Sequence, residues 1–455
     1  MGIISHIPWI RNSGFMYRGR LSVFRERNII NNNSIKNDYA ILHRIQYLVG
    51  ERNMNRQKYF ITVIGTILIS IGLHTTLKGE KQNALHHNLS VNLNKYLGTH
   101  YKHPFDYVVD KFKDHDLVII GEYHHIQQYV CFIDQLIPRL YSEAGVRFIG
   151  CEFFASSCQK DIDKLVNGDE YDNALETQII RESAVNAGFM WPYEEYIEVF
   201  KTVWKLNKNI TEKSERFSII FMAPDINWHN IHYGNEEEKK TAMLQFMEAD
   251  KLYADPIIKE FDNNHHKGLV WCGATHAVTR LKGNPKRGPE IRCGGYLYKQ
   301  YRDKVFHIEL HGFWYYRGRD ESYALNGLLD KVLNEHNKPI GFDLIGSPFA
   351  TLELPTDFIW AVNNPSAKFR DYCDGYIWLL PLEKFEGNHI MNIDKIVPDD
   401  EAFHKVIRNA HSKSAQELNL SRDEFIALWR KQADEFEHFQ LSFMPFLLDH
   451  DKNIP

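Results

Sequence analysis

Four short apolar runs, each followed by a stretch with helical periodicity, constrain the fold of this chain more than any other feature. Uninterrupted apolar runs of five to nine residues are typical of strands that are buried on both faces. Their alternation with amphipathic stretches indicates βα units. The sequence therefore predicts an α/β fold with a central, mostly parallel sheet flanked by helices, and an additional helical region near the C-terminus. The runs are LVIIG (117–121), RFIGCEFF (147–154), FSIIFMAPD (217–225) and GLVWCGATH (268–276).

The segments between and after these runs carry helix signals. Apolar residues recur at three- and four-residue spacing over 126–140, where Pro138 is expected to kink the helix or end its regular part. A long charged stretch at 236–262 predicts a further helix. Near the C-terminus, Ser421 and Glu424 form a capping box that predicts a helix start.

A fifth run, VFHIELHG (305–312), alternates between apolar and polar residues. Its polar residues project to one face of the predicted strand, where they could hold a metal, although a simple polar strand face is the favoured interpretation. Further strands or strand edges are expected at GFDLIG, DFIWAV and GYIWLL. The polar residues of the alternating run are His307, Glu309 and His311.

The N-terminal part differs from the rest in charge and hydropathy. Residues 1–58 contain ten Arg or Lys and three Asp or Glu, which leaves 44 basic and 56 acidic residues in the remaining chain. The fifteen uncharged residues of 59–73 follow Arg56 and Lys58, which is the pattern of a secretory signal or a membrane anchor. We therefore expect an exported, periplasmic or cell-envelope protein, with a possible membrane anchor at 59–73.

The same features predict the domain organisation. Residues 1–53 are expected to be a disordered or over-extended N-terminus, and 54–78 a signal peptide or membrane anchor. The α/β core is predicted at 79–312. Residues 313–455 form either a later part of that domain or an added lobe. The acidic body makes nucleic acid an improbable partner, and the oligomeric state stays open.

Polar residues occur at the ends of the four apolar runs. The first run ends in Glu122 and His124, the second in Glu152, the third in Asp225 and the fourth in His276. Because ligands bind outside the carboxyl ends of strands in open α/β sheets, these side chains are predicted to meet in one site. The other reading of each residue is a helix cap or an ordinary polar surface position.

The residue types suit two kinds of chemistry. Glu122, His124, Glu152 and His276 could act as a general base and its partners, with Glu152 favoured as the base. Alternatively, His124, Glu152, Asp225 and His276 could bind Zn²⁺, Mn²⁺ or Fe²⁺ and activate water. Spacing along the chain does not decide between them.

Several common catalytic motifs are absent from the sequence. It contains no G-x-S-x-G, no G-x-x-x-x-G-K-[ST] and no G-x-G-x-x-G that opens a helix. This argues against a standard α/β-hydrolase, a P-loop enzyme or a dinucleotide oxidoreductase. Cys151 and Cys272 lie inside predicted strands and are expected to be small buried residues.

The strand-end motifs resemble those of the ChaN-like group within the TIKI, TraB and erythromycin-esterase-like superfamily. The resemblance covers about 105–312 and rests on LVIIGEYHHIQQY, RFIGCEFF, WPYEEYIEVF and GLVWCGATHA. It places motif residues on Glu122, His124, Glu152, Tyr196 and His276. Esterase relatives carry G-E-x-x-H, so His125 competes with His124 as the motif histidine. Trp191, Pro192 and Gly273 match further motif positions.

The resemblance implies more than one activity. ChaN-like members are envelope proteins linked to haem iron uptake, TIKI-like members are metal-dependent proteases, and esterase-like members hydrolyse an ester with His and Glu. For this chain it implies either a hydrolase of an ester or amide, with a small-molecule or peptide substrate, or a haem-binding protein. Under the haem reading, His125 and Tyr123 are the candidate cofactor ligands beside His124. A module that retains the fold without activity is a third possibility.

Overall fold

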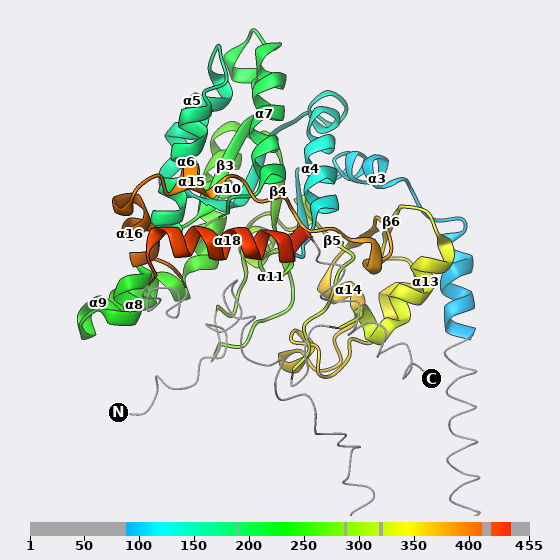
Figure 1. The fold of residues 1–455 in the computed structure, drawn as a ribbon. Helices are drawn as coiled ribbons and strands as arrows, with labels where there is room; N and C mark the ends of the chain where they lie inside the picture. Colours follow the sequence, from blue (N-terminus) through cyan, green and yellow to red (C-terminus); the bar gives the residue numbers. More distant parts are fainter. Residues whose placement is uncertain (1–87, 189–190, 286–288, 318–321, 412–419, 438–455) are drawn as a thin grey trace, which may run out of the picture. The chain divides into compact units, whose positions relative to one another are not determined.

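The structure is a computed structural model that describes residues 88–188, 191–285, 289–317, 322–411 and 420–437 (Figure 1). The chain separates into two compact units, and nearly all described residues belong to the one that contains 90–454. The expected disordered segment 1–53 and signal segment 54–78 lie outside the described residues. Within the described ranges, no helix has both the length and the apolar character needed to cross a membrane.

A seven-stranded sheet forms the centre of the described unit, in the order β3-β2-β4-β1-β5-β7-β6. All neighbouring strands run parallel except β6 and β7. This confirms the predicted α/β fold with a mostly parallel sheet. The strands are β1 (Leu117–Glu122), β2 (Val146–Ala155), β3 (Ser218–Ala223), β4 (Lys267–Gly273), β5 (Val305–Leu310), β6 (Ile340–Asp343) and β7 (Gly375–Trp378).

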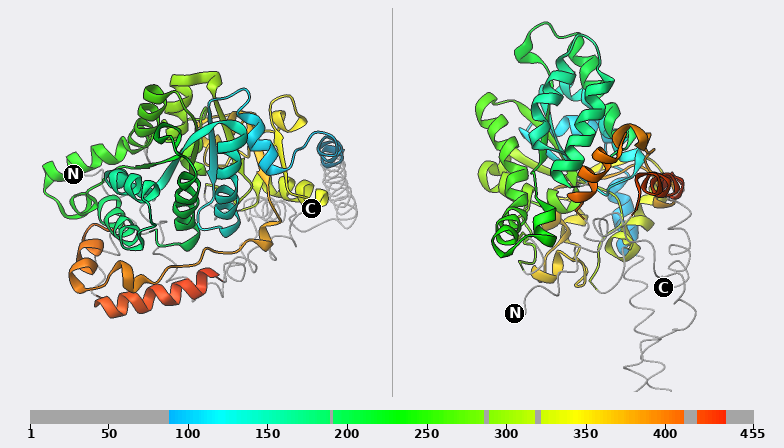
Figure 2. Two further views of the ribbon diagram at one scale, coloured as in Figure 1. Left: turned by 90° about the horizontal axis from the view of Figure 1, so that it is seen from above. Right: turned by 60° about the vertical axis from the view of Figure 1, so that its left-hand side comes forward.

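Helices cover both faces of the sheet, as Figure 1 and the two views of Figure 2 show. One face carries α4 and α7, and the other carries α10 and α11. The helices are α3 (Pro104–Lys111), α4 (Gln127–Arg139), α5 (Gln159–Asn167), α6 (Asn173–Ala187), α7 (Glu194–Lys208), α8 (Trp228–Tyr233), α9 (Glu236–Met247), α10 (Ala249–Asn264), α11 (Ala274–Ala277), α12 (Cys293–Tyr301), α13 (Leu328–His336), α14 (Phe369–Tyr372), α15 (Ile393–Ile396), α16 (Asp400–Arg408) and α18 (Arg422–Glu437).

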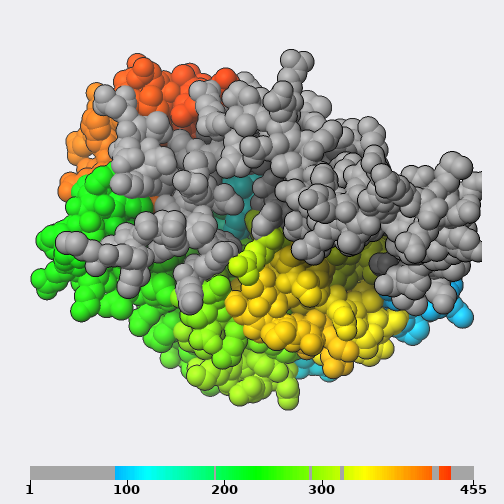
Figure 3. All heavy atoms as spheres, turned by 90° about the horizontal axis from the view of Figure 1, so that it is seen from below, coloured from blue at the N-terminus to red at the C-terminus, as the bar shows by residue number. Residues whose placement is uncertain are grey.

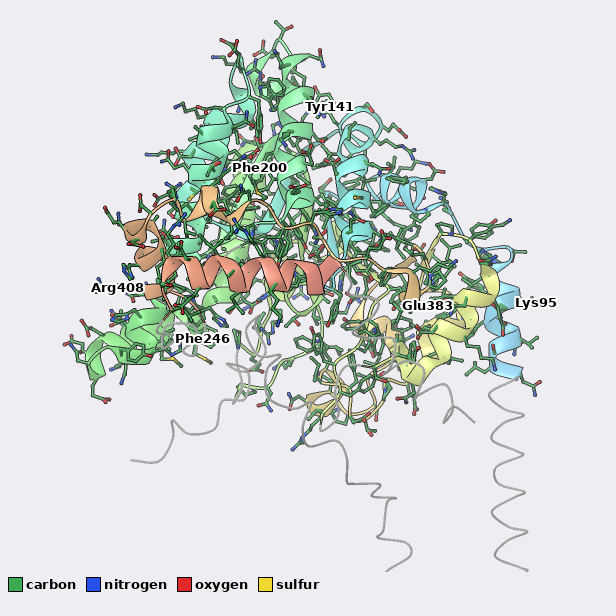
Figure 4. All side chains as sticks on the ribbon, viewed as in Figure 1. Lys95, Tyr141, Phe200, Phe246, Glu383 and Arg408 are labelled. Atoms are coloured by element: carbon green, nitrogen blue, oxygen red, sulfur yellow. The ribbon has the colours of Figure 1, made fainter. Side chains whose placement is uncertain are left out.

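The strand core is closely packed because small and large residues alternate between neighbours. A side chain at Gly268 of β4 would collide with the ring of Phe148 on β2, and one at Gly150 would meet Ile257 of α10. On α7, Phe200 contacts the ring of Phe221 on β3, and Figure 4 labels it among the side chains of this layer. Dense packing of this kind holds the strand ends in fixed positions.

Local signals in the sequence agree with the helix boundaries. Helix α4 ends at Arg139, directly after Pro138, and a π-helical turn (Leu140–Ala144) follows. Ser421 and Glu424 exchange the hydrogen bonds of a capping box at the start of α18. The charged stretch at 236–262 forms two helices, α9 and α10, which meet at Glu248.

The later part of the chain contributes to the same sheet, since β6 and β7 both come after residue 312. GFDLIG overlaps β6, and GYIWLL contains β7. DFIWAV forms no strand: Phe358 makes one isolated antiparallel bridge, to Tyr316, and Ala361–Asn363 is a 3-10 turn. In the alternating run of 305–312, the polar face of β5 is buried like the apolar one, because β5 is buried along its whole length. Both of its neighbours in the sheet and the helix layers exclude solvent from it.

Candidate active site

The last residue of β1, Glu122, is the best-bonded carboxylate at the strand ends. Its side chain is buried and receives the hydroxyl of Tyr196 on α7 at 2.5 Å. The indole N–H of Trp271 on β4 donates to its other oxygen at 2.6 Å. The rings of Tyr196 and Trp271 stack at 5.0 Å. Two donors on rigid, stacked rings therefore fix the position of the Glu122 carboxylate.

The third partner of Glu122 is His124, which lies two residues later in the turn after β1. The Nδ1 atom of His124 lies 3.1 Å from Oε1 of Glu122, and the side chain is 34% exposed. Trp191 and Phe153 place their rings edge-on to the imidazole at 5.2 and 5.6 Å. A histidine that binds a carboxylate through Nδ1 presents Nε2 as its free acceptor.

Glu152, near the end of β2, lies on the other side of the same space. Its Oε2 accepts the backbone N–H of Gly273 at 2.5 Å, and its Oε1 lies 3.4 Å from Nε2 of His276. A Cβ atom on Gly273 would come within 2.6 Å of Nε2 of His124 and 3.4 Å of Oε2 of Glu152. The absence of a side chain at Gly273 thus lets His124 and Glu152 approach each other.

His276 completes a second acid–histidine pair. It lies on the single turn of α11, three residues after the end of β4, and its Nδ1 lies 2.7 Å from Oδ1 of Asp250. Asp250 is buried at the start of α10 and also accepts the N–H of Cys293 at 2.8 Å and Nη1 of Arg292 at 3.1 Å. The Nε2 atom of His276 faces Glu152.

The electrostatic environment raises the pKa of both site histidines. Burial lowers the pKa of His124, but the hydrogen bond with Glu122 and the charges of Glu152 and Glu122 outweigh it. Burial likewise opposes the charges of Asp250 and Glu152 at His276, and the pKa of His276 is raised as well. The pKa of Asp250 is lowered, because His276 and Arg292 outweigh its burial.

Comparisons with known proteins bear on the fold alone. No model of a protein family matches the sequence, and no curated protein matches it. A solved structure of a succinoglycan biosynthesis protein is similar over 68% of this chain and 99% of its own, with 12% identity and a TM-score of 0.49. A mutant of the erythromycin esterase EreC in its open conformation is similar over 61% and 93%, with 9% identity and a TM-score of 0.43.

A third similar structure is ChaN of Campylobacter jejuni with cofacially bound haem. It covers 46% of this chain and 86% of its own, with 15% identity and a TM-score of 0.27. All three TM-scores lie below 0.5, so these likenesses carry no conclusion about activity.

The structure brings four predicted site residues together: Glu122, His124, Glu152 and His276. It does not bring Asp225 to them. Asp225 follows β3 as expected, but its carboxylate is exposed and accepts a hydrogen bond from Ser157 at 2.9 Å. A strand end delivers a side chain to the correct edge of the sheet, and the local turn then decides where it points.

The two consecutive histidines of the first motif, His124 and His125, have different surroundings. His125 has a backbone φ of 69°, and its ring stacks on that of Trp191 at 4.8 Å and contacts Tyr193 at 5.0 Å. Burial lowers the pKa of His125 to about 3, so this ring is neutral at physiological pH. His124, and not His125, is the histidine that contacts Glu122. Tyr123 lies beside the site, in ring contact with Tyr315 at 5.9 Å.

The four residues predicted as metal ligands do not form a metal site. Asp225 binds Ser157, and across the described ranges no group of three or more His, Cys, Asp or Glu is arranged to hold a metal ion. His276 directs Nδ1 to Asp250 and Nε2 to Glu152. Both ring nitrogens of His276 therefore face protein carboxylates.

Three functional neighbours escaped the sequence analysis: Trp271, Asp250 and Arg292. Trp271 lies inside a predicted strand, where a core position is the default expectation. Asp250 and Arg292 come from the charged stretch of α10 and the loop before α12, 26 residues before and 16 residues after His276 in the sequence. The spacing of charged residues along one chain contains no signal for such long-range pairs.

Proposed function

We propose that this protein hydrolyses an ester or amide at the cluster of Glu122, His124, Glu152 and His276. The observation that carries the proposal is the placement of His124. Its Nδ1 binds the fixed carboxylate of Glu122, while its Nε2 faces Glu152 across Gly273. A carboxylate-oriented imidazole with a free Nε2 is the arrangement of a general base.

The geometry favours His124 over Glu152 as the base. Both oxygens of Glu152 already face protein groups, the N–H of Gly273 and Nε2 of His276. His124 is the more exposed of the two side chains, at 34% against 9%. In the proposed reaction Nε2 of His124 removes a proton from water, and the resulting hydroxide attacks the carbonyl carbon. Glu152 orients the water and compensates the positive charge that forms on His124.

The test is turnover of an activated ester, p-nitrophenyl butyrate, by the purified full-length chain. Glu152→Gln should lower kcat/KM by about a hundredfold, because it removes the charge that compensates protonated His124 and misplaces the water, and a misplacement of about 1 Å can cost about a hundredfold in rate. The folded fraction, measured by circular dichroism, should stay unchanged. If the wild-type chain and Glu152→Gln turn over a verified ester or amide substrate at the same rate, the proposal is wrong.

A matched control is available in Glu176→Gln. Glu176, in the first turn of α6, is a buried glutamate that accepts a tyrosine hydroxyl at 2.5 Å, as Glu122 does, but its partner is Tyr171, just before the helix. We expect this variant to keep wild-type turnover. A loss equal to that of Glu152→Gln would show that the assay reports the burial of a neutral amide rather than chemistry at the strand ends.

Haem binding is the second candidate function. It is favoured by the exposure of His124 between aromatic rings, since a neutral imidazole nitrogen is a common axial ligand of haem iron. Haemin added to the full-length chain would then give a Soret band that weakens in His124→Ala. A Soret titration without saturable binding would remove this candidate and leave the hydrolase proposal in place.

We also propose that the chain is exported through residues 54–78. The proposal rests on the basic flank and the uncharged run of 59–73. Expression with a C-terminal tag, followed by fractionation and N-terminal sequencing, tests it. A full-length chain found only in the cytoplasm would contradict it.

A further inference from the structure

The second acid–histidine pair of the site is as completely bonded as the first. Asp250 is about 1% exposed, and both its oxygens have partners. Oδ1 accepts from Nδ1 of His276 at 2.7 Å and from the backbone N–H of Cys293 at 2.8 Å, and Oδ2 accepts from Arg292 at 3.1 Å. A buried carboxylate with three donors holds one rotamer, because any other would leave charges unpaired.

This arrangement fixes the orientation of His276 as well. With Nδ1 donating to Asp250, only Nε2 can face the site, where it lies 3.4 Å from Oε1 of Glu152. The ring of Tyr253, one turn after Asp250 on α10, covers the imidazole at 4.8 Å. Helix α10 therefore contributes both the carboxylate that orients His276 and the ring that shields it.

We propose that Asp250 is a positioning residue that holds His276 as the proton donor of the reaction, so that the two acid–histidine pairs perform opposite tasks. This inference rests on the proposed hydrolase function and assigns a role to a residue outside the four predicted ones. Glu122 orients the histidine that accepts a proton from water. Asp250 orients the histidine that gives a proton to the departing group.

The charges around the two rings assign these tasks. His276 faces two carboxylates directly, those of Asp250 and Glu152, and the cation Arg292 is bound to Asp250. His124 has one direct carboxylate contact, Glu122 at 3.1 Å; the more distant charge of Glu152 also raises its pKa, and the charge of His276 lowers it. A proton on one ring thus disfavours a proton on the other, and the ring with two direct carboxylate partners retains it.

The proton balance of the reaction follows. A water proton moves to Nε2 of His124 as the oxygen bonds to the carbonyl carbon, whose π electrons move to the carbonyl oxygen. When that oxygen reforms the double bond, the bond to the leaving oxygen or nitrogen breaks, and the leaving atom takes the Nε2 proton of His276. His124 ends protonated and His276 neutral. One proton then passes from His124 to His276 through solvent and restores the site.

The test is an NMR titration of His276 in the full-length chain labelled with ¹³C,¹⁵N-histidine, with the signal assigned from its loss in His276→Asn. Asp250→Asn should lower the pKa of His276, because a carboxylate that favours the imidazolium is removed. Arg292→Gln should raise it, because a cation that disfavours the imidazolium is removed. Arg147→Gln, which alters the arginine paired with Glu215 at the start of β2, is the control and should leave it unchanged.

The opposite shifts expected for the His276 pKa in the two variants separate a positioning role of Asp250 from a merely structural one. Unchanged pKa values in both variants, or shifts in the same direction, would overturn the inference. If Asp250→Asn does not fold, Arg292→Gln alone tests the inference. A pKa of His276 that fails to increase in Arg292→Gln contradicts it. The titration does not depend on turnover. A wild-type chain without esterase or amidase activity would overturn the proposed function, whereas the NMR result reports on the Asp250–His276 pair itself.

Discussion

Two glutamate–histidine clusters lie on neighbouring strands of this sheet and behave in opposite ways. In the site, the pKa values of His124 and His276 are both raised. In the interior of β5, burial lowers the pKa of His307 to about 3 and raises the pKa of Glu309 to about 8. The clusters are adjacent, because Glu309 pairs in register with Gly121, the residue before Glu122.

The difference lies in the partners of each carboxylate and not in the residue types. Glu122 has three donors on its two oxygens. Glu309 accepts one hydrogen bond, from Tyr372 at 2.9 Å, and its buried Oε2 has no hydrogen-bond partner, with Nε2 of His307 3.4 Å away. A buried carboxyl with one donor favours the neutral form. The interior cluster is therefore neutral, whereas the pKa values of the two site histidines are raised.

The strand ends also differ from the interior in access. The polar atoms of His307 and Glu309 are enclosed by the sheet and its helices, whereas His124 and His276 keep 34% and 21% of their side chains exposed. Figure 3 views the molecule from below, where green segments around α8 and α9 lie at the left and yellow segments around α13 at the right. Of the two clusters, the one at the strand ends is therefore the more accessible to solvent.

The largest expected effect comes from filling the space between His124 and Glu152. Gly273→Ala would place a methyl group 2.6 Å from the His124 ring, although the backbone φ of −59° suits alanine. A displacement of about 1 Å can cost about a hundredfold in rate, and we expect that loss in kcat/KM for p-nitrophenyl butyrate. Gly98→Ala, whose added Cβ would meet nothing closer than 3.4 Å, is the control with wild-type activity.

The next effect concerns the interior cluster and stability. Glu309 has its proton in the folded state up to about pH 8 but loses it near pH 4.5 when unfolded. The folded protein therefore binds more protons in this range, and stability falls as pH rises. His307 is neutral in the folded state, so the stability that it contributes is complete above pH 6.5 and is lost only as pH falls below that value.

Between pH 6.5 and 8 the change from Glu309 should amount to about 2 kcal/mol, at roughly 1.4 kcal/mol per pH unit. Glu309→Gln removes this dependence. In urea unfolding at both pH values, its stability relative to the wild type should therefore increase with pH. A constant difference between the two proteins would show that Glu309 is ionised in the folded state.

The smallest effect is expected in the site. Glu122→Gln removes the hydrogen-bonded charge that raises the pKa of His124, so NMR titration should show a lower His124 pKa in this variant. The pKa of His125, which burial and the charge of His124 lower, should stay low. An unchanged His124 pKa would mean that the contact with Glu122 is not formed in solution.

The sequence predicted the parts of this molecule that depend on local patterns. The continuous apolar runs identified β1 to β4, and their ends identified Glu122, His124, Glu152 and His276. Parallel strands place their carboxyl ends at one edge, so the strand pattern alone brought these residues together.

What could not be predicted depends on turn geometry and on long-range pairing. The choice between His124 and His125 rests on the positive φ of His125, which turns its ring toward Trp191. Asp225 was misplaced because the turn after β3 directs it to Ser157. Asp250 was missed because its partner His276 lies on another element, and no periodicity links the two.

The measurement that tests the central claim most directly is the pH dependence of kcat/KM compared with the pKa of His124 in the same protein. A general base must be neutral, so activity should fall as pH drops through the pKa of His124. Because that pKa is raised, the acid limb should lie above pH 6.5. We predict that the acid limb of the kcat/KM profile coincides with the His124 pKa measured by NMR in the wild type. In Glu122→Gln, both should move together to lower pH. A limb that stays in place while the His124 pKa moves would contradict it.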